Sequence, residues 1–221
     1  MQKLSLNGDW TLRVSGWDHD VPATVPGSVY HDLLTAGEIP DPFWRDNETE
    51  ALKLMENDFT YTRDFTAPGD LADCDRVLLR CEGLDTLAEI QINGAPIGEA
   101  DNMHRTWEFD VKGLLRPGEN DISVTFRSPT KFIRRAYAQN RADGTSDAMV
   151  GFPHIRKAHC MFGWDWGPRL PDAGIWRDIG ILGIETARIE QIHIRQGTWT
   201  AGWPWRWRPA STDAPTGWTC G

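Results

Sequence analysis

The sequence has little cysteine, no long apolar run and none of the short motifs that mark nucleotide or serine-hydrolase chemistry. Its four cysteines lack close C-x-x-C spacing, so buried free thiols are expected rather than a zinc site or disulfides. No stretch approaches the apolar length of a membrane-spanning helix, and the first residues do not resemble a signal peptide. A phosphate loop, a dinucleotide fingerprint and a Gly-x-Ser-x-Gly elbow are also missing. We therefore expect a cytoplasmic protein with no cofactor and no membrane partner.

Tryptophan and charge are unevenly represented. The 221 residues include 12 Trp, an excess typical of aromatic packing or of a surface that stacks on sugars. The net charge is −9, yet residues 1–121 hold 24 acidic and 10 basic side chains, whereas residues 122–221 hold 8 and 13. The cations of the basic half are scattered and belong to no recognised binding motif, so no nucleic-acid partner is expected.

Apolar residues alternate with polar ones in six short segments, as they do in strands with one buried face. The alternating sets are Phe59, Tyr61 and Phe65; Val77, Leu79 and Cys81; Ile90 and Ile92; Trp107, Phe109 and Val111; Ile122, Val124 and Phe126; and Ile179 and Ile181. Between two of the sets stands Asn93-Gly94, the dipeptide best suited to a tight hairpin. Short strands at this spacing predict an all-β fold, an antiparallel β-sandwich.

One short helix is predicted to accompany the sandwich. Ser28 can cap its start and Gly37 can end it, and its apolar stripe consists of Val29, Leu33 and Leu34.

A long loop is predicted where strand alternation is lost, from Ser128 to Gly174. Its first part, residues 134–149, is polar and is expected to be mobile. Its second part, residues 151–169, concentrates aromatic, charged and glycine residues, as a rigid binding loop does.

The densest chemical signal in that loop is Trp164-Asp165-Trp166, which we interpret as a sugar-binding site. Indole faces can stack on the apolar C–H patches of a pyranose, and a carboxylate can accept hydrogen bonds from two neighbouring hydroxyls. The alternative is that both Trp are core residues of a strand and that Asp165 is a solvated carboxylate between them. Gly163, Gly167 and a following Pro make a long paired strand there unfavourable.

Supporting roles in the loop are assigned to Arg156, Lys157, Gly163 and Gly167. Arg156-Lys157 can donate to a ligand or brace the loop, and bracing is favoured because partly buried cations more often satisfy carboxylates and carbonyls of the protein. The glycines allow the sharp turns that expose the three central side chains. His154 and His159 lack further ligands at suitable spacing, so no metal site is predicted.

Eight short strings in this order, spread over positions 4–196, resemble the first domain of the β-mannosidases of glycoside hydrolase family two. They are Leu6-Asn-Gly-Asp-Trp10, Val25-Pro-Gly27, Ile39-Pro-Asp-Pro-Phe43 with Asn47-Glu48, Gly83-Leu-Asp-Thr86, Asn102-Met-His-Arg105, Arg156-Lys157, Phe162-Gly-Trp-Asp-Trp-Gly-Pro168 and Gly174-Ile-Trp-Arg177. The resemblance implies a jelly-roll-like, galactose-binding-domain-like sandwich. It also implies a following immunoglobulin-like domain and a (β/α)₈ barrel that carries both catalytic glutamates.

The same resemblance assigns roles. Trp164, Asp165 and Trp166 would reach the pocket for the terminal mannose of a β-mannoside, and no catalytic residue would lie in this chain. Its expected domains are a sandwich over residues 1–186 and a linker with the first strand of the next domain over residues 187–196. An unstructured tail over residues 197–221 has five Trp but no Val, Ile or Leu, which a shifted reading frame would explain.

Three functions are compatible with these observations: a fragment of a glycosidase, a free carbohydrate-binding module, and a scaffolding sandwich without a ligand. The first is favoured, because a scaffold gives the Trp-Asp-Trp loop no purpose and a free module should end in a clean strand or a polar linker.

Overall fold

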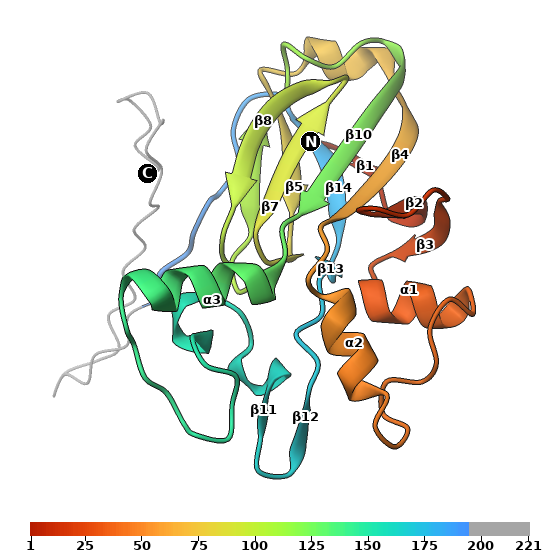
Figure 1. Cartoon of the computed structure of the whole chain (residues 1–221). Coiled ribbons are helices and arrows are strands. Elements are labelled where there is room, and N and C mark those ends of the chain that lie inside the picture. Colours follow the sequence, from red (N-terminus) through yellow and green to blue (C-terminus); the bar gives the residue numbers. More distant parts are fainter. Residues whose placement is uncertain (195–221) are drawn as a thin grey trace, which may run out of the picture.

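The computed structural model describes residues 1–194 and contains two main antiparallel sheets (Figure 1). One sheet has six strands in the order β3-β2-β4-β10-β7-β8, and the other has four in the order β1-β14-β5-β9. The six strands are β3 (Val21–Val25), β2 (Gly8–Val14), β4 (Phe59–Ala67), β10 (Gly118–Phe126), β7 (Ala88–Ile92) and β8 (Ala95–Ala100). The four strands are β1 (Gln2–Ser5), β14 (Ile179–Ile184), β5 (Arg76–Cys81) and β9 (Trp107–Asp110). The predicted antiparallel β-sandwich is confirmed.

The core lies between the two sheets and contains the residues that the alternation placed inside. All members of the six predicted sets are buried except Trp107 and Phe109, which are half-buried. These two belong to β9, which pairs only with β5 and forms the edge of its sheet. An edge strand has a neighbour on one side only, so its side chains remain partly exposed.

The hairpin between β7 and β8 forms at the predicted dipeptide. Asn93 and Gly94 both have positive φ, 52° and 74°, and Ile92 pairs with Ala95 across the turn. Two consecutive positive φ values are the requirement of a type I′ turn, which Asn-Gly meets at low cost.

Three helices are present in the described residues, not one. The predicted helix is α1 (Val29–Thr35), capped by the Ser28 hydroxyl, which accepts a hydrogen bond from the amide of His31. The second is α2 (Glu48–Leu54) and the third is α3 (Pro129–Gln139). Helix α2 buries only Ala51 and gives no apolar stripe, whereas α3 has a capped start and one apolar face, so its signal was present in the sequence and was missed.

The helix α3 also corrects the prediction for the long loop. Ser128 and Pro129 form a standard helix start, in which the Ser128 hydroxyl accepts from the amide of Lys131 at 3.1 Å. Residues 134–139, expected in a mobile loop, therefore belong to a helix. Figure 1 shows that the three helices lie together at one end of the sandwich, next to the hairpin of β11 (Phe162–Trp164) and β12 (Gly167–Arg169).

Short elements complete the fold. Strand β13 (Gly174–Ile175) pairs with β6 (Leu84–Asp85), and three 3₁₀ turns cover Gly69–Asp73, Phe152–His154 and His159–Met161. No helix of the described residues is long and apolar enough to cross a membrane. Cys74 and Cys81 are buried free thiols, whereas Cys160 is exposed, so the expectation of buried thiols is wrong for Cys160.

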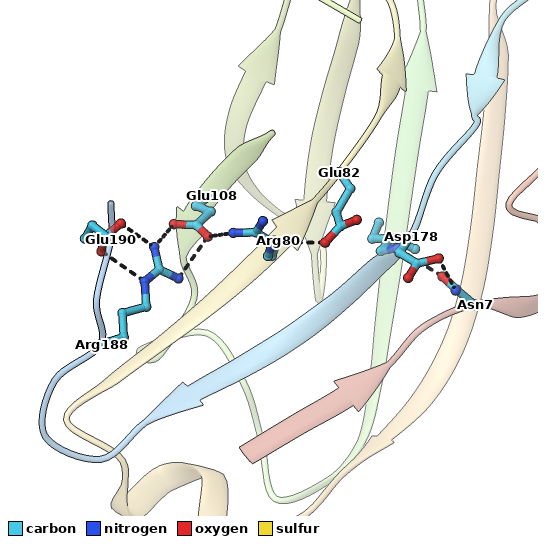
Figure 2. Close-up of polar contacts among 8 residues, drawn as sticks. Asn7, Arg80, Glu82, Glu108, Asp178, Arg188 and Glu190 are labelled. Atoms are coloured by element: carbon cyan, nitrogen blue, oxygen red, sulfur yellow. Dashed lines mark hydrogen bonds and ion pairs between the residues drawn. The ribbon is translucent and has the colours of Figure 1, made fainter. Parts of the chain in front are cut away.

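Residues 185–194, which we call the exit segment, leave the sandwich after β14 and are fixed by Arg188 (Figure 2). Its guanidinium donates to Glu108 of β9 at 2.9 Å and to Glu190 at 2.9 and 3.0 Å. Arg80 of β5 donates to the same Glu108 at 2.7 Å. The two cations hold the pKa of Glu108 below its usual range.

The domain boundaries predicted from sequence stay predictions. The last strand of the sandwich ends at Ile184, two residues before the proposed boundary at 186. Within the proposed linker, residues 187–194 contain no named strand. Residues 195–221, with the proposed tail, lie outside the described part of the chain.

Candidate functional site

The Trp-Asp-Trp motif forms the tip of the β11–β12 hairpin. Phe162 pairs with Arg169 and Trp164 with Gly167, so Asp165 and Trp166 are the two turn residues. Trp164 is 50% exposed and Trp166 is 83% exposed, and Asp165 is exposed between them. These exposures exclude the alternative in which both indoles belong to the core. The hairpin presents two indole faces and one carboxylate to the exterior.

The base of the hairpin is anchored in a second, smaller core. Phe162 is fully buried there with Ile133 of α3, Phe152 and Ile155. The amide of Met149 also donates to the carbonyl of Phe162 at 2.9 Å. An apolar anchor of this kind holds the hairpin without occupying its exposed tip.

A side chain 121 positions away fixes the second strand of the hairpin. The Arg169 guanidinium donates to Glu48, the first residue of α2, at 2.6 Å. The pair ties the hairpin to a helix that sequence analysis did not predict.

The predicted bracing residue Lys157 is fully buried. Its ammonium forms an ion pair with the carboxylate of Asp85 and donates to the main-chain carbonyl of Asp172 at 2.6 Å. Asp85 lies in β6 of the sandwich, and Asp172 follows the hairpin. Lys157, within the binding loop, thus contacts β6 on one side and the chain that follows the hairpin on the other, and its bracing role stays a prediction.

Asp172 is a partly buried carboxylate with its own hydrogen bonds. Its side chain accepts from the amides of Tyr30 at 3.1 Å and Ala173 at 2.8 Å. Desolvation raises the pKa of Asp172 to about 6, although these hydrogen bonds act in the opposite direction. The carboxylate joins the start of α1 to the chain that follows the hairpin.

The other three supporting residues differ in what surrounds them. The Arg156 side chain is exposed, and its main chain bridges to Asn102 and accepts from the amide of Met103 at 3.0 Å. Gly163 has a φ of +101°, and a Cβ there would lie 2.6 Å from Cγ of Arg169. Gly167 has no positive φ, and the nearest atom to an added Cβ would be 3.8 Å away. Of the two glycines, only Gly163 occupies a backbone conformation that disfavours other residues.

A groove of about 680 Å³ runs beside the hairpin. One wall consists of Trp164, Trp166, Gly167 and Pro168 of the hairpin. The rest of its lining comes from Ser28, Tyr30, His31, Leu34, Pro42, Phe43, Cys160, Met161, Leu170 and Asp172. Asp165 does not line it, so the exposed carboxylate and the apolar groove are separate features of one hairpin.

The residues that line the groove outside the hairpin were not predicted as site residues from the sequence. Leu34 was expected in the apolar stripe of α1, but it is 41% exposed and faces the groove. Phe43 is 75% exposed, and its neighbour Trp44, which does not line the groove, is 62% exposed. Two adjacent aromatic residues after Pro40-Asp-Pro42 were a usable signal, because a Pro-rich turn places them on a loop.

The two histidines of the loop make contacts within the protein. The His154 ring lies edge-on to Tyr137 and the His159 ring edge-on to Phe152. No group of three or more His, Cys, Asp or Glu within residues 1–194 could hold a metal ion.

The antiparallel β-sandwich, with an exposed aromatic hairpin at one end, places this domain in the galactose-binding-like class of β-sandwich domains. A family model described as "Glycosyl hydrolase 2 galactose-binding domain-like" matches residues 10–177, and the chain belongs to this family. The resemblance and the antiparallel, galactose-binding-like β fold expected from the sequence are therefore confirmed, whereas three helices are present in the described residues instead of one and the jelly-roll-like arrangement stays a prediction.

Two of the curated relatives that match most of this chain are beta-mannosidases. The chain is 34% identical to the beta-mannosidase of Bos taurus over 186 residues, which cover 80% of this chain and 21% of that protein. It is 33% identical to the beta-mannosidase of Mus musculus over 198 residues, 85% of this chain and 22% of that protein. The chain thus spans about a fifth of the length of the curated relatives it matches.

Solved structures give the same result. The beta-D-mannosidase from Dictyoglomus thermophilum superposes with a TM-score of 0.85 at 36% identity, covering 90% of this chain and 24% of that one. The exo-chitosanase of Amycolatopsis orientalis superposes at 0.64 with 16% identity over 89% of this chain and 22% of that one, a likeness in fold alone.

Proposed function

We propose that this chain is the amino-terminal sugar-binding domain of a β-mannosidase, an enzyme that removes terminal β-D-mannose residues. The hairpin tip supports this most directly: Trp164, Asp165 and Trp166 are exposed together on a base that is buried and ion-paired. The similarity to beta-mannosidases from mammals and from Dictyoglomus thermophilum supports the choice of substrate.

In this proposal Asp165 accepts hydrogen bonds from two neighbouring hydroxyls of the terminal mannose, and the indoles cover the apolar side of the ring. The catalytic pair of carboxylic acids comes from a (β/α)₈ barrel, and an immunoglobulin-like domain lies between that barrel and the sandwich. The chain itself supplies recognition and excludes water from one side of the sugar.

A hybrid enzyme tests the proposal. Residues 1–184 of this chain would replace the matching domain of the beta-D-mannosidase from Dictyoglomus thermophilum. We expect the hybrid to hydrolyse an aryl β-mannoside and Asp165→Asn to lower kcat/KM about ten- to a hundredfold. That factor corresponds to one charge-assisted hydrogen bond of roughly 1.5–3 kcal/mol. A fall in kcat shows that the bond strengthens in the transition state, and a rise in KM alone shows equal strength in both states.

The matched control is Asp75→Asn, an exposed carboxylate on the turn before β5. It should leave the kinetics of the hybrid unchanged. If the hybrid is inactive, the 221-residue chain can be titrated with methyl β-D-mannoside, for which we expect a Kd on the order of millimolar or weaker. Identical behaviour of Asp165→Asn and the unmodified chain in both assays would refute the role of Asp165.

A further inference from the structure

The hairpin contributes to two surfaces of different chemistry, an exposed carboxylate at its tip and an apolar groove beside it. Trp164 and Trp166 line the groove, whereas the exposed Asp165 between them does not. A mannose ring held by the carboxylate of Asp165 would therefore leave the groove on the other side of the indoles available. The groove, of about 680 Å³, falls within the size range of small-molecule sites.

The lining of the groove suits a ring with apolar faces. Trp164 and Trp166 of the hairpin and Phe43 of a separate loop all line it and are exposed, so two segments of the chain contribute aromatic surface to the groove. Polar side chains are the minority of its lining: Ser28, Tyr30, His31, Cys160 and Asp172. Asp172 already accepts two main-chain hydrogen bonds, which leaves the groove with little capacity to select among hydroxyl patterns.

We propose that this groove binds the second pyranose ring of a β-mannoside oligosaccharide, the ring to which the terminal mannose is linked. Both indoles line the groove and flank Asp165 at the hairpin tip, so adjacent rings of one oligosaccharide can contact the carboxylate and the groove. A protein surface in the groove would cover Trp164 and Trp166 and leave only Asp165 for a sugar. The groove contributes affinity for a disaccharide over a monosaccharide and accepts different hydroxyl patterns. This inference rests on the proposed function.

The experiment uses the ¹⁵N-labelled 221-residue chain and two probes, methyl β-D-mannoside with one ring and β-1,4-mannobiose with two. Shifts of the indole N–H signals give a Kd for each. We expect mannobiose to bind about three- to tenfold more tightly, the contribution of one stacked ring. Phe43→Ala should remove that advantage and leave the Kd of methyl β-D-mannoside unchanged.

Trp44→Ala is the matched control, because Trp44 is an exposed aromatic neighbour outside the groove. It should retain the preference for mannobiose. Both substitutions are at exposed positions, and the amide spectrum of each variant verifies the fold. Equal Kd values for the two probes in the unmodified chain, or equal losses in Phe43→Ala and Trp44→Ala, would overturn the groove assignment alone. Absence of shifts from both sugars would contradict the proposed function on which it rests.

Discussion

Two residues near the binding loop, Lys157 and Asp172, carry the most unusual environments at the scale of single side chains. Lys157 is the only cation that is buried in the described residues, and its ammonium is paired with Asp85. A buried charge is tolerated when it is paired and fully hydrogen-bonded. Asp85 also accepts from the Thr86 hydroxyl, so both charges have partners.

Replacing Lys157 by Met should destabilise the protein strongly. The substitution keeps much of the side-chain volume but leaves the Asp85 carboxylate buried without its cation, a situation that costs about 3–5 kcal/mol. Urea unfolding followed by circular dichroism measures the free energy of unfolding. Lys53→Met removes an exposed lysine paired with Glu50 and should cost at most about 1 kcal/mol. Equal losses in the two variants would contradict a bracing role for Lys157.

Asp172 should make stability depend on pH in a defined direction. The pKa of Asp172 in the folded chain is raised to about 6, whereas the pKa of an Asp in an unfolded chain is about 3.9. Between these values the folded chain holds a proton that the unfolded chain lacks, so this group stabilises the fold as pH falls through 6. Asp172→Asn removes the titration.

The free energy of unfolding of the unmodified chain, minus that of Asp172→Asn, should therefore rise by roughly 1 kcal/mol or more between pH 7 and pH 5. Urea unfolding at pH 7, 6 and 5 checks this. Groups whose pKa is lowered, such as Glu108, change the free energy of unfolding with pH in the opposite direction. They do so equally in both proteins, so their contribution cancels in the difference. A difference that does not change with pH would show that Asp172 is ionised across this range in the folded chain.

The β11–β12 hairpin and the exit segment each contain a residue whose substitution tests how the element is held in place. In the hairpin, the backbone at Gly163 is left-handed and closely surrounded. The exit segment is attached to the sandwich by the ion pair of Arg188 with Glu108 and by that of Glu185 with the amino terminus.

Gly163→Ala and Gly167→Ala should show which of the two positions in the hairpin requires glycine. Alanine at 163 must adopt a φ of +101° and displace the Arg169 side chain, which we expect to cost roughly 1–3 kcal/mol. Alanine at 167 meets only ordinary contacts and should change stability by about 0.5 kcal/mol or less. Thermal unfolding gives both values. A larger loss at 167 than at 163 would mean that Gly167 supports the loop in another way.

Glu108→Gln should loosen the exit segment. Glutamine keeps the shape of the side chain but loses the charge that attracts Arg188 and Arg80 (Figure 2). We expect faster trypsin cleavage after Arg188, because proteolysis requires local release of the backbone. Glu82→Gln, which affects only a 3.3 Å contact with Arg80, is the control. Unchanged cleavage in Glu108→Gln would show that other contacts fix the segment.

At the scale of the whole molecule, the groove of the described residues is lined by a single carboxylate. Hydrolysis of a glycoside uses two carboxyl groups on opposite sides of the bond. Within the described residues the groove contains one acid, Asp172, whose side chain is already hydrogen-bonded to the main chain. The exposed Asp165 lies outside the groove.

The purified chain should therefore hydrolyse no aryl β-mannoside. The measurement is release of the aryl group over a buffer blank at high protein concentration. Turnover that a β-mannosidase inhibitor abolishes, and that survives a second purification step, would contradict the expectation and place a catalytic pair in this chain.

The sequence by itself determined six of the strands in the two main sheets, one turn and the exposed hairpin tip. Period-two burial is a local property, so β4, β5, β7, β10 and β14 could be located from their own residues. The Asn93-Gly94 turn and the cap at Ser28 follow from backbone preferences of the residues themselves. The glycines and proline around Trp164-Asp165-Trp166 likewise indicated a turn and not a buried strand.

Only the tertiary structure decided which residues hold the hairpin and which other segments line the groove beside it. Lys157 meets Asp85 across 72 positions and Arg169 meets Glu48 across 121, and no local pattern encodes such pairs. The groove exists because α1, the loop at Phe43 and the hairpin meet at one end of the sandwich. The short helix α2 buries too few residues to give a clear periodic signal, whereas α3 has a capped start and an apolar face that the sequence does show. Their packing, and the burial of Lys157, arise from contacts between segments that are distant in the sequence.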